Sequence, residues 1–251
     1  MQYGLTSVTF RTLSAEDTIA LAVKAGLTAI EWGGDVHCPP KNIEAARNIA
    51  RLTREAGLAV SSYGSYYTLG EAEQAYTYDD VLDTAEALGA GIVRIWAGHL
   101  PSAKVCDAQF ARLVSEAKRL ADLSQRRGII MAFEYHGNSL TDSAENACRL
   151  MRAIHHPFCR LYWQANFERS VEENLRDIDI VRNDVVCAHV FAWKSNTEQL
   201  PLLEKEREWN AFYRRLEKGA EIPYLIEFVK DGTPEQFLSD CTALKKILEI
   251  E

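Results

Sequence analysis

Residues 125–134 read QRRGIIMAFE and decide the fold: a polar helix end, a glycine, and a short apolar run that closes on a glutamate. The stretches KAGLTAIEW (24–32), REAGLAVSSYG (54–64) and ALGAGIVRIW (87–96) repeat this order. Glycine tolerates the left-handed conformation in which many helices end, so each stretch predicts a helix followed by a strand. Repeated units of this kind are typical of βα units and a parallel sheet.

Eight such units cover the chain. Strands are predicted at 4–9, 28–32, 58–63, 91–97, 128–134, 159–164, 185–191 and 222–228. Helices are predicted at 14–25, 42–56, 78–88, 107–126, 142–154, 171–181, 208–218 and 234–249, with N-cap signatures at Ser14, Thr141 and Thr233. We therefore expect one (β/α)₈ TIM barrel domain over 1–251; a doubly wound sheet is disfavoured because no G-x-G-x-x-G turn follows the first strand.

Composition narrows the class of partner. The net charge of -8 and the pI near 5.4 disfavour nucleic acid, whose binding depends on Lys and Arg. No apolar run approaches the roughly 20 residues of a membrane span, and six scattered cysteines indicate reduced thiols. We expect a cytoplasmic protein with a small-molecule substrate.

Polar side chains stand at the ends of several apolar strands, where a charged group is costly to bury unless it is paired or metal-bound. Glu31 ends the second strand, and Glu134, Gln164, His189 and Glu227 come from the fifth to the eighth. These last four can converge above the barrel axis, and they form a ligand set for a divalent cation that prefers oxygen. The competing interpretations are a structural ion pair of the glutamates with Arg94, and a hydrogen-bonded core histidine at position 189.

Five segments carry a resemblance that spans nearly the whole chain. They are IEWGGDVHCPP (30–40), FEYHGNSLTDS (133–143), YWQAN (162–166), HVFAWK (189–194) and IEFVKDGTPEQFLSD (226–240). With them the chain resembles the sugar phosphate isomerase/epimerase superfamily, also called xylose isomerase-like or AP endonuclease family 2 barrels. The resemblance implies a TIM barrel active in carbohydrate metabolism, with a divalent metal ion (Mn, Mg, Co or Zn), and a homodimer.

By position, the resemblance makes Glu134 and Glu227 the metal-binding glutamates that also move the proton, and His189 the metal-binding histidine. Gln164 stands where many members have an aspartate, which lowers the negative charge of the ligand set and the expected affinity for the ion. The implied reaction is removal of a carbon-bound proton by one glutamate and its return by the other.

Further candidates for substrate binding lie near the same strand ends. Glu31, Trp32 and His37 line the pocket or hold the turn after the second strand, and His136 points to the same side as Glu134. Lys194 and Lys230 bind a phosphate or carboxylate, or are simply solvated. Three aromatic side chains stack on the sugar or fill the barrel mouth: Tyr63, Trp96 and Trp163.

The leading hypothesis is a metal-dependent isomerase or epimerase. A dehydratase or lyase acting on a polyol or sugar acid begins with the same proton abstraction and stays open. An abasic-site endonuclease requires a basic groove and more metal ligands, and a non-catalytic sugar-binding barrel is kept open by Gln164.

Overall fold

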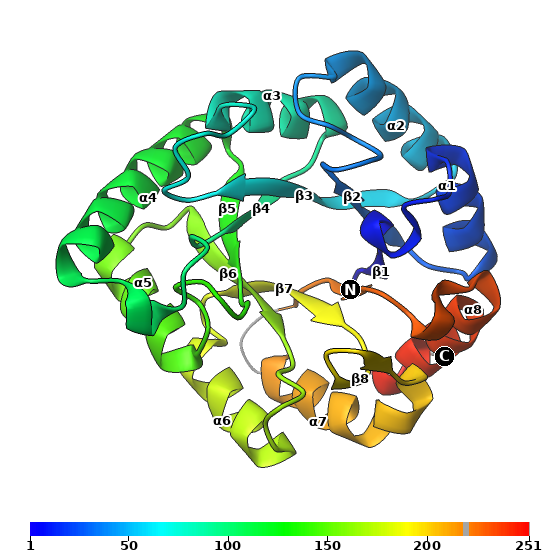
Figure 1. The fold of residues 1–251 in the computed structure, drawn as a ribbon. Coiled ribbons are helices and arrows are strands. Elements are labelled where there is room, and N and C mark those ends of the chain that lie inside the picture. Colours follow the sequence, from blue (N-terminus) through cyan, green and yellow to red (C-terminus); the bar gives the residue numbers. More distant parts are fainter. Residues whose placement is uncertain (218–220, 251) are drawn as a thin grey trace.

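Eight parallel strands close into a barrel in this computed structural model, which describes residues 1–217 and 221–250 (Figure 1). The strands follow one another around the barrel in chain order, and the last, β10, pairs with β1. Their bounds are β1 (Tyr3–Thr6), β2 (Ala29–Gly33), β3 (Ala59–Thr68), β4 (Ile92–Trp96), β5 (Ile130–Glu134), β6 (Cys159–Gln164), β7 (Val185–Val190) and β10 (Tyr224–Ile226). The predicted (β/α)₈ barrel is confirmed.

Helices surround the barrel, one after each strand (Figure 1). They are α1 (Ala15–Lys24), α2 (Ile43–Glu55), α3 (Tyr78–Leu88), α4 (Asp107–Arg127), α5 (Ala144–Ile154), α6 (Val171–Val181), α7 (Glu206–Leu216) and α8 (Pro234–Ile247). Short 3₁₀ helices η1 (Ser7–Phe10), η2 (Ser102–Lys104), η3 (Leu202–Lys205) and η4 (Lys230–Gly232), and a hairpin of β8 (Trp193–Ser195) and β9 (Glu198–Gln199), lie in the connections. Within the described residues, no helix has the length and hydropathy needed to traverse a bilayer.

Local sequence explains where the helices begin and end. Gly89 and Gly128 cap α3 and α4 in the left-handed region, as their place before a strand predicts. The Ser14 and Thr233 side chains accept hydrogen bonds from the first turns of α1 and α8. The predicted cap at Thr141 is wrong: Ser143 caps α5, while the Thr141 hydroxyl donates to the backbone carbonyl of Glu134.

Four predicted elements have clearly different bounds in the structure. The first strand ends at Thr6, because the chain turns into η1 and the Ser7 hydroxyl accepts a hydrogen bond from the Gly33 amide. The third strand runs on to Thr68, and the eighth is shorter than 222–228. The predicted helix 208–218 begins at Glu206 instead, and its predicted last residue lies outside the described residues.

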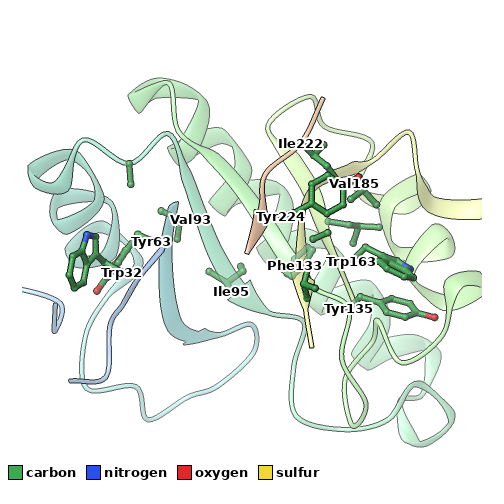
Figure 2. Packing of buried hydrophobic residues seen from close by; sticks show 14 of the residues in the cluster. Trp32, Tyr63, Val93, Ile95, Phe133, Tyr135, Trp163, Val185, Ile222 and Tyr224 are labelled. Carbon is green, nitrogen blue, oxygen red and sulfur yellow. The ribbon is translucent and has the colours of Figure 1, made fainter. Parts of the chain in front are cut away.

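Strand alternation divides the side chains between two regions. A large apolar cluster fills the space between barrel and helices, and Figure 2 shows part of it, including Phe133 of β5 and Trp163 of β6. A second, small cluster belongs to the opposite, inward faces of β5, β6, β7 and β10: Ala132, Tyr162, Cys187 and Leu225. This inner cluster, called the floor below, packs directly beneath the polar residues at the carboxyl ends of the strands.

Candidate functional site

Four polar side chains stand one layer above that floor, at the carboxyl ends of the strands. Each lies two residues after a member of the inner cluster, so each shares its inward direction. They are Glu134 of β5, Gln164 of β6, His189 of β7 and Glu227, which directly follows β10. The amide of Glu227 donates to the Val190 carbonyl, which extends the β7–β10 pairing to this residue. Active sites of TIM barrels occupy this face.

His189 is the centre of the group and is fully buried. Its Nδ1 atom lies 3.4 Å from Glu227 Oε2 and 3.8 Å from Glu134 Oε1, while Nε2 lies 3.4 Å from Glu31 Oε1. One donor atom from each of Glu134, His189 and Glu227 falls within 4.8 Å of the others. The two predicted proton-moving glutamates therefore meet at the same ring nitrogen.

Glu134 is anchored through one of its two carboxylate oxygens. Arg94 of β4 donates Nη1–H to Oε2, and the Trp96 indole donates to the same oxygen at 2.6 Å. The ion pair with Arg94 thus exists, but it engages only Oε2 and leaves Oε1 directed to His189. Glu134 can therefore be held by Arg94 through Oε2 while Oε1 stays available to a metal ion or a proton.

Glu31 of β2 contacts Arg94 and His189 and does not line the cavity. It is 1 % exposed, accepts a hydrogen bond from Ser62 at 2.8 Å, and lies 3.5 Å from Arg94 Nε. Burial raises its pKa, but attraction to His189 and Arg94, with the hydrogen bonds, outweighs this and lowers the pKa to about 2. Glu31 is therefore ionised at neutral pH.

The same neighbours shift the pKa values of the other buried charged groups. Burial lowers the pKa of His189, yet attraction to Glu227 and Glu31 raises it to about 10. Burial raises the pKa of Glu227, but His189 and Arg94 bring it below its usual value. Burial also disfavours the charged form of Arg94, and its carboxylate neighbours raise its pKa well above the ordinary value. Opposite charges thus compensate each other's burial.

The chemistry of the donor atoms fits a divalent cation. The Nδ1 atom of His189, which faces Glu134 and Glu227, and the Oε1 atom of Gln164 are buried without a hydrogen-bond partner. Buried polar atoms are rarely left unsatisfied, so unpaired donors beside two carboxylates indicate a missing ligand. An imidazole nitrogen, an amide oxygen and two carboxylates suit Mn²⁺, Mg²⁺, Co²⁺ or Zn²⁺.

A cavity of about 600 Å³ opens above this group. Glu134, Gln164, Glu227 and Arg94 form its base. Trp96 and His136, both predicted to bind substrate, lie in its wall, where their rings stack with centroids 5.6 Å apart. The volume lies in the usual range for small-molecule sites.

Three predicted substrate-binding aromatic residues do not line the cavity. They pack in the large apolar cluster, where Figure 2 labels them: Trp32, Tyr63 and Trp163. Trp32 donates its indole N–H to Thr53 of α2, and the Tyr63 hydroxyl donates to the Cys38 carbonyl. Trp163 packs edge-on against two aromatic rings of α7. The reason is strand alternation: each of the three is adjacent in sequence to an inward residue and so faces the helices.

Three other predicted residues also miss the cavity. The His37 ring is 3.0 Å from the Leu13 carbonyl and packs beside Trp32. Lys194 is exposed and pairs with Glu198 at 3.0 Å, and Lys230 lines an adjoining open hollow that shares Trp193 and Asn196 with the cavity. The solvated interpretation of Lys194 is the one this structure supports.

Some cavity residues were not predicted. Arg11 follows η1, and the loops after β5, β6 and β7 contribute Asn138, Asn166 and Asn196. Phe228 directly follows Glu227 and has a positive φ of 60°. The only sequence signal for them is their position just after a strand, which many residues without function share.

Comparison with known proteins agrees with this architecture. Residues 19–166 match the model of the xylose isomerase-like TIM barrel, the AP endonuclease 2 family. No curated protein matches the chain.

Several solved structures share the fold. A probable 3-DHS dehydratase from Bacillus anthracis has a TM-score of 0.80 at 16% identity, over 98% of this chain and 99% of its own. D-Psicose 3-epimerase from Clostridium cellulolyticum H10 has a TM-score of 0.76 at 12% identity, over 100% and 99%. A xylose isomerase-like barrel protein from Mycobacterium smegmatis, solved with magnesium, has a TM-score of 0.72 at 14% identity, over 99% and 97%.

Proposed function

Because the chain belongs to the xylose isomerase-like TIM barrel family, we propose that it is a metal-dependent isomerase or epimerase of a small sugar or related hydroxycarbonyl compound. The observation that carries the proposal is the convergence of Glu134 and Glu227 on His189 Nδ1 at the base of a cavity. Two carboxylates at one site are the groups needed to remove and return a carbon-bound proton. The likeness to an epimerase and to a magnesium-bound relative supports the reaction type and the ion.

The residues that would hold the ion are Glu134, Gln164, His189 and Glu227. A bound divalent cation would polarise a carbonyl oxygen and stabilise the negative charge that develops when the neighbouring carbon loses its proton. Two carboxylates, an amide and a neutral imidazole balance its charge. No other protein cation is needed to neutralise these ligands, so Arg94 remains available to hold Glu134.

The two glutamates differ in their partners and therefore suit different tasks. Glu134 Oε2 is fixed by Arg94 and Trp96, which sets the direction in which Oε1 accepts or donates a proton. Glu227 has His189 as its only contact among these charged groups and is 7 % exposed. Both carboxylates are buried, which limits the access of bulk water to a proton in transit.

Deuterium incorporation tests the proposal. Protein purified without chelator and supplied with Mn²⁺ is incubated in D₂O with a panel of ketoses, aldoses and hydroxypyruvate, and the sugars are then analysed by NMR and mass spectrometry. We expect deuterium on a carbon next to a carbonyl, and a product of unchanged mass apart from the isotope. Metal binding without incorporation into any compound would contradict the proposal.

A dehydratase is the second candidate, and the likeness to a probable 3-DHS dehydratase favours it. It begins with the same proton removal but expels the neighbouring hydroxyl as water. The same panel, extended to polyol acids, separates the two: a dehydratase yields a product lighter by one water with ultraviolet absorbance, and an isomerase or epimerase does not.

A further inference from the structure

Charge sets what the cavity can accept. Two guanidinium groups line it, Arg11 and Arg94, and so do four carboxylates: Glu134, Asp142, Glu168 and Glu227. Carboxylates thus exceed cations by two. Behind the wall, Glu31 adds a third negative charge, which His189 offsets only while its ring is protonated and holds no metal. A bound divalent cation would still leave one negative charge in excess. An anionic substrate would meet net repulsion there.

Both guanidinium groups are already engaged by the protein. Arg11 contacts Asp35 Oδ2 at 2.5 Å, donates to the Tyr66 hydroxyl at 2.8 Å and to the Val8 carbonyl at 3.3 Å. Arg94 is taken by Glu134 and Glu31. The positive charge of both side chains is thus already offset by protein carboxylates, which weakens their attraction for a phosphate or carboxylate.

At the place where many barrels bind phosphate, the starts of two helices offer little to an anion. That place lies between the loops after the seventh and eighth strands, at the start of a short helix. Here the first amide of η3, from Leu202, donates at 2.9 Å to Asp240, a buried carboxylate. The first turn of α8 carries Glu235, and Pro234 there has no N–H to donate. Within 1–217 and 221–250, no lysine lines the cavity.

Most of the other residues that line the cavity are uncharged. Six partly exposed aromatic side chains face the cavity: Tyr66, Trp96, Phe167, Phe191, Trp193 and Phe228. The side-chain amides of Asn138, Gln164, Asn166 and Asn196 join them. Aromatic faces pack on the C–H surfaces of sugars, and an amide can both donate to and accept from hydroxyl groups. Trp96 also contacts Glu134, so this apolar surface reaches the reacting groups.

From these observations we infer that the cavity selects an unphosphorylated, uncharged sugar and rejects sugar phosphates and sugar acids. The inference rests on the proposed function only in taking this cavity as the substrate site. Selection follows from excess negative charge, from arginines already engaged, and from a wall of aromatic and amide groups.

Calorimetric binding to matched pairs tests the inference. The probes are D-fructose against D-fructose 6-phosphate, and D-glucitol against D-glucitol 6-phosphate and D-gluconate, each titrated with and without Mn²⁺. Inorganic phosphate alone controls for direct binding to the ion. We expect the neutral compound of each set to bind at least about tenfold more tightly, because like charges repel in a partly dry cavity. Equal or tighter binding of the anions, or no binding of the neutral compounds, would overturn the inference.

Two variants place the binding in this cavity. Trp193→Leu should weaken D-fructose binding by about twofold to tenfold, the range for an aromatic contact. Phe110→Leu, an aromatic residue on α4 that packs against Arg149 outside the cavity, should leave it unchanged. An equal loss in both variants would argue against the inferred site.

Different results would contradict the proposed reaction and the inferred selectivity. Deuterium incorporation into D-fructose 6-phosphate but not into free sugars would overturn the selectivity and leave the isomerase or epimerase intact. Tight binding of neutral sugars by a protein that never exchanges their protons would support the selectivity and end the proposed reaction.

Discussion

The two halves of the barrel use strand-end glutamates in different ways. In the half made by β2–β4, Glu31 is enclosed by Ser62, Arg94 and His189, and it does not reach the cavity. In the half made by β5–β10, Glu134 and Glu227 line the cavity and turn an oxygen to His189. All three glutamates are at most 7 % exposed, so burial alone does not distinguish them.

The difference lies in the partners. A buried carboxylate surrounded by a hydroxyl, a guanidinium and an imidazole has a structural task, since its charge is already compensated. Glu134 and Glu227 instead line the cavity, so an incoming metal ion or a substrate proton can reach them. We therefore expect changes in one half to affect stability first, and changes in the other to affect chemistry first.

The largest expected effect is on proton exchange in the β5–β10 half. Glu227→Gln should slow deuterium incorporation into the accepted sugar by about a hundredfold to ten-thousandfold, because the amide cannot carry the proton. Glu134→Gln should lose a similar factor and also some stability, since Arg94 loses its charged partner. Rates in D₂O and melting temperatures measure the two effects.

Glu86→Gln is the matched control, because Glu86 is an exposed glutamate of α3 that pairs with Arg127. Its exchange rate should equal that of the wild type. Full activity in Glu227→Gln would show that the open carboxylate is not catalytic and would remove the contrast between the halves.

The next effect is on stability in the β2–β4 half. Glu31→Gln should lower the free energy of unfolding by about 3–5 kcal/mol, the cost of breaking a buried ion pair. Ser62→Ala, which removes only the hydroxyl donor to Glu31, should cost about 1–2 kcal/mol. Urea unfolding measures both, and a Glu31→Gln protein as stable as the wild type would contradict the assignment.

The pH dependence of that difference follows from the pKa of Glu31. Its pKa is about 2 in the folded protein and ordinarily 4.5, so folding favours the ionised form. The resulting stability is fully present above pH 4.5 and is lost as the pH falls toward 2. The difference between wild type and Glu31→Gln should thus be constant from pH 7 to 5 and shrink below that.

The smallest effect concerns Gln164, which makes the ligand set less negative than three carboxylates would. Gln164→Asp should tighten Mn²⁺ binding by about tenfold, since an added charge on a ligand raises affinity for a dication. Calorimetric titration measures it, with Asn166→Asp, two residues further along the same chain segment, as the control. Equal gains in both variants would mean that general charge, and not the position of Gln164, is responsible.

The fold was predictable because its signals are local and repeated. Glycine caps such as Gly89 and Gly128, together with eight alternating apolar and amphipathic segments, indicate the barrel without any long-range information. Boundaries were less predictable where a contact with another strand decides the turn, as the hydrogen bond from the Gly33 backbone amide to the Ser7 hydroxyl does.

The candidate site was predictable where a polar residue interrupts an apolar strand, as at Glu134 and His189. It was not predictable where the side chain's face of the strand alone decides whether a residue lines the cavity or packs in the core. Trp32 and Trp163 have the composition expected of a sugar site, yet each is one residue out of phase with an inward neighbour. The partners of Glu31 and the loop residues Arg11 and Phe228 depend on tertiary contacts that no local pattern encodes.

Anomalous diffraction from crystals soaked in Mn²⁺ tests the central claim most directly. We expect one strong peak bonded to Glu134, Gln164, His189 and Glu227, and its loss from Glu227→Gln crystals. A peak confined to other residues, or no peak at saturating Mn²⁺, would show that these carboxylates do not share an ion.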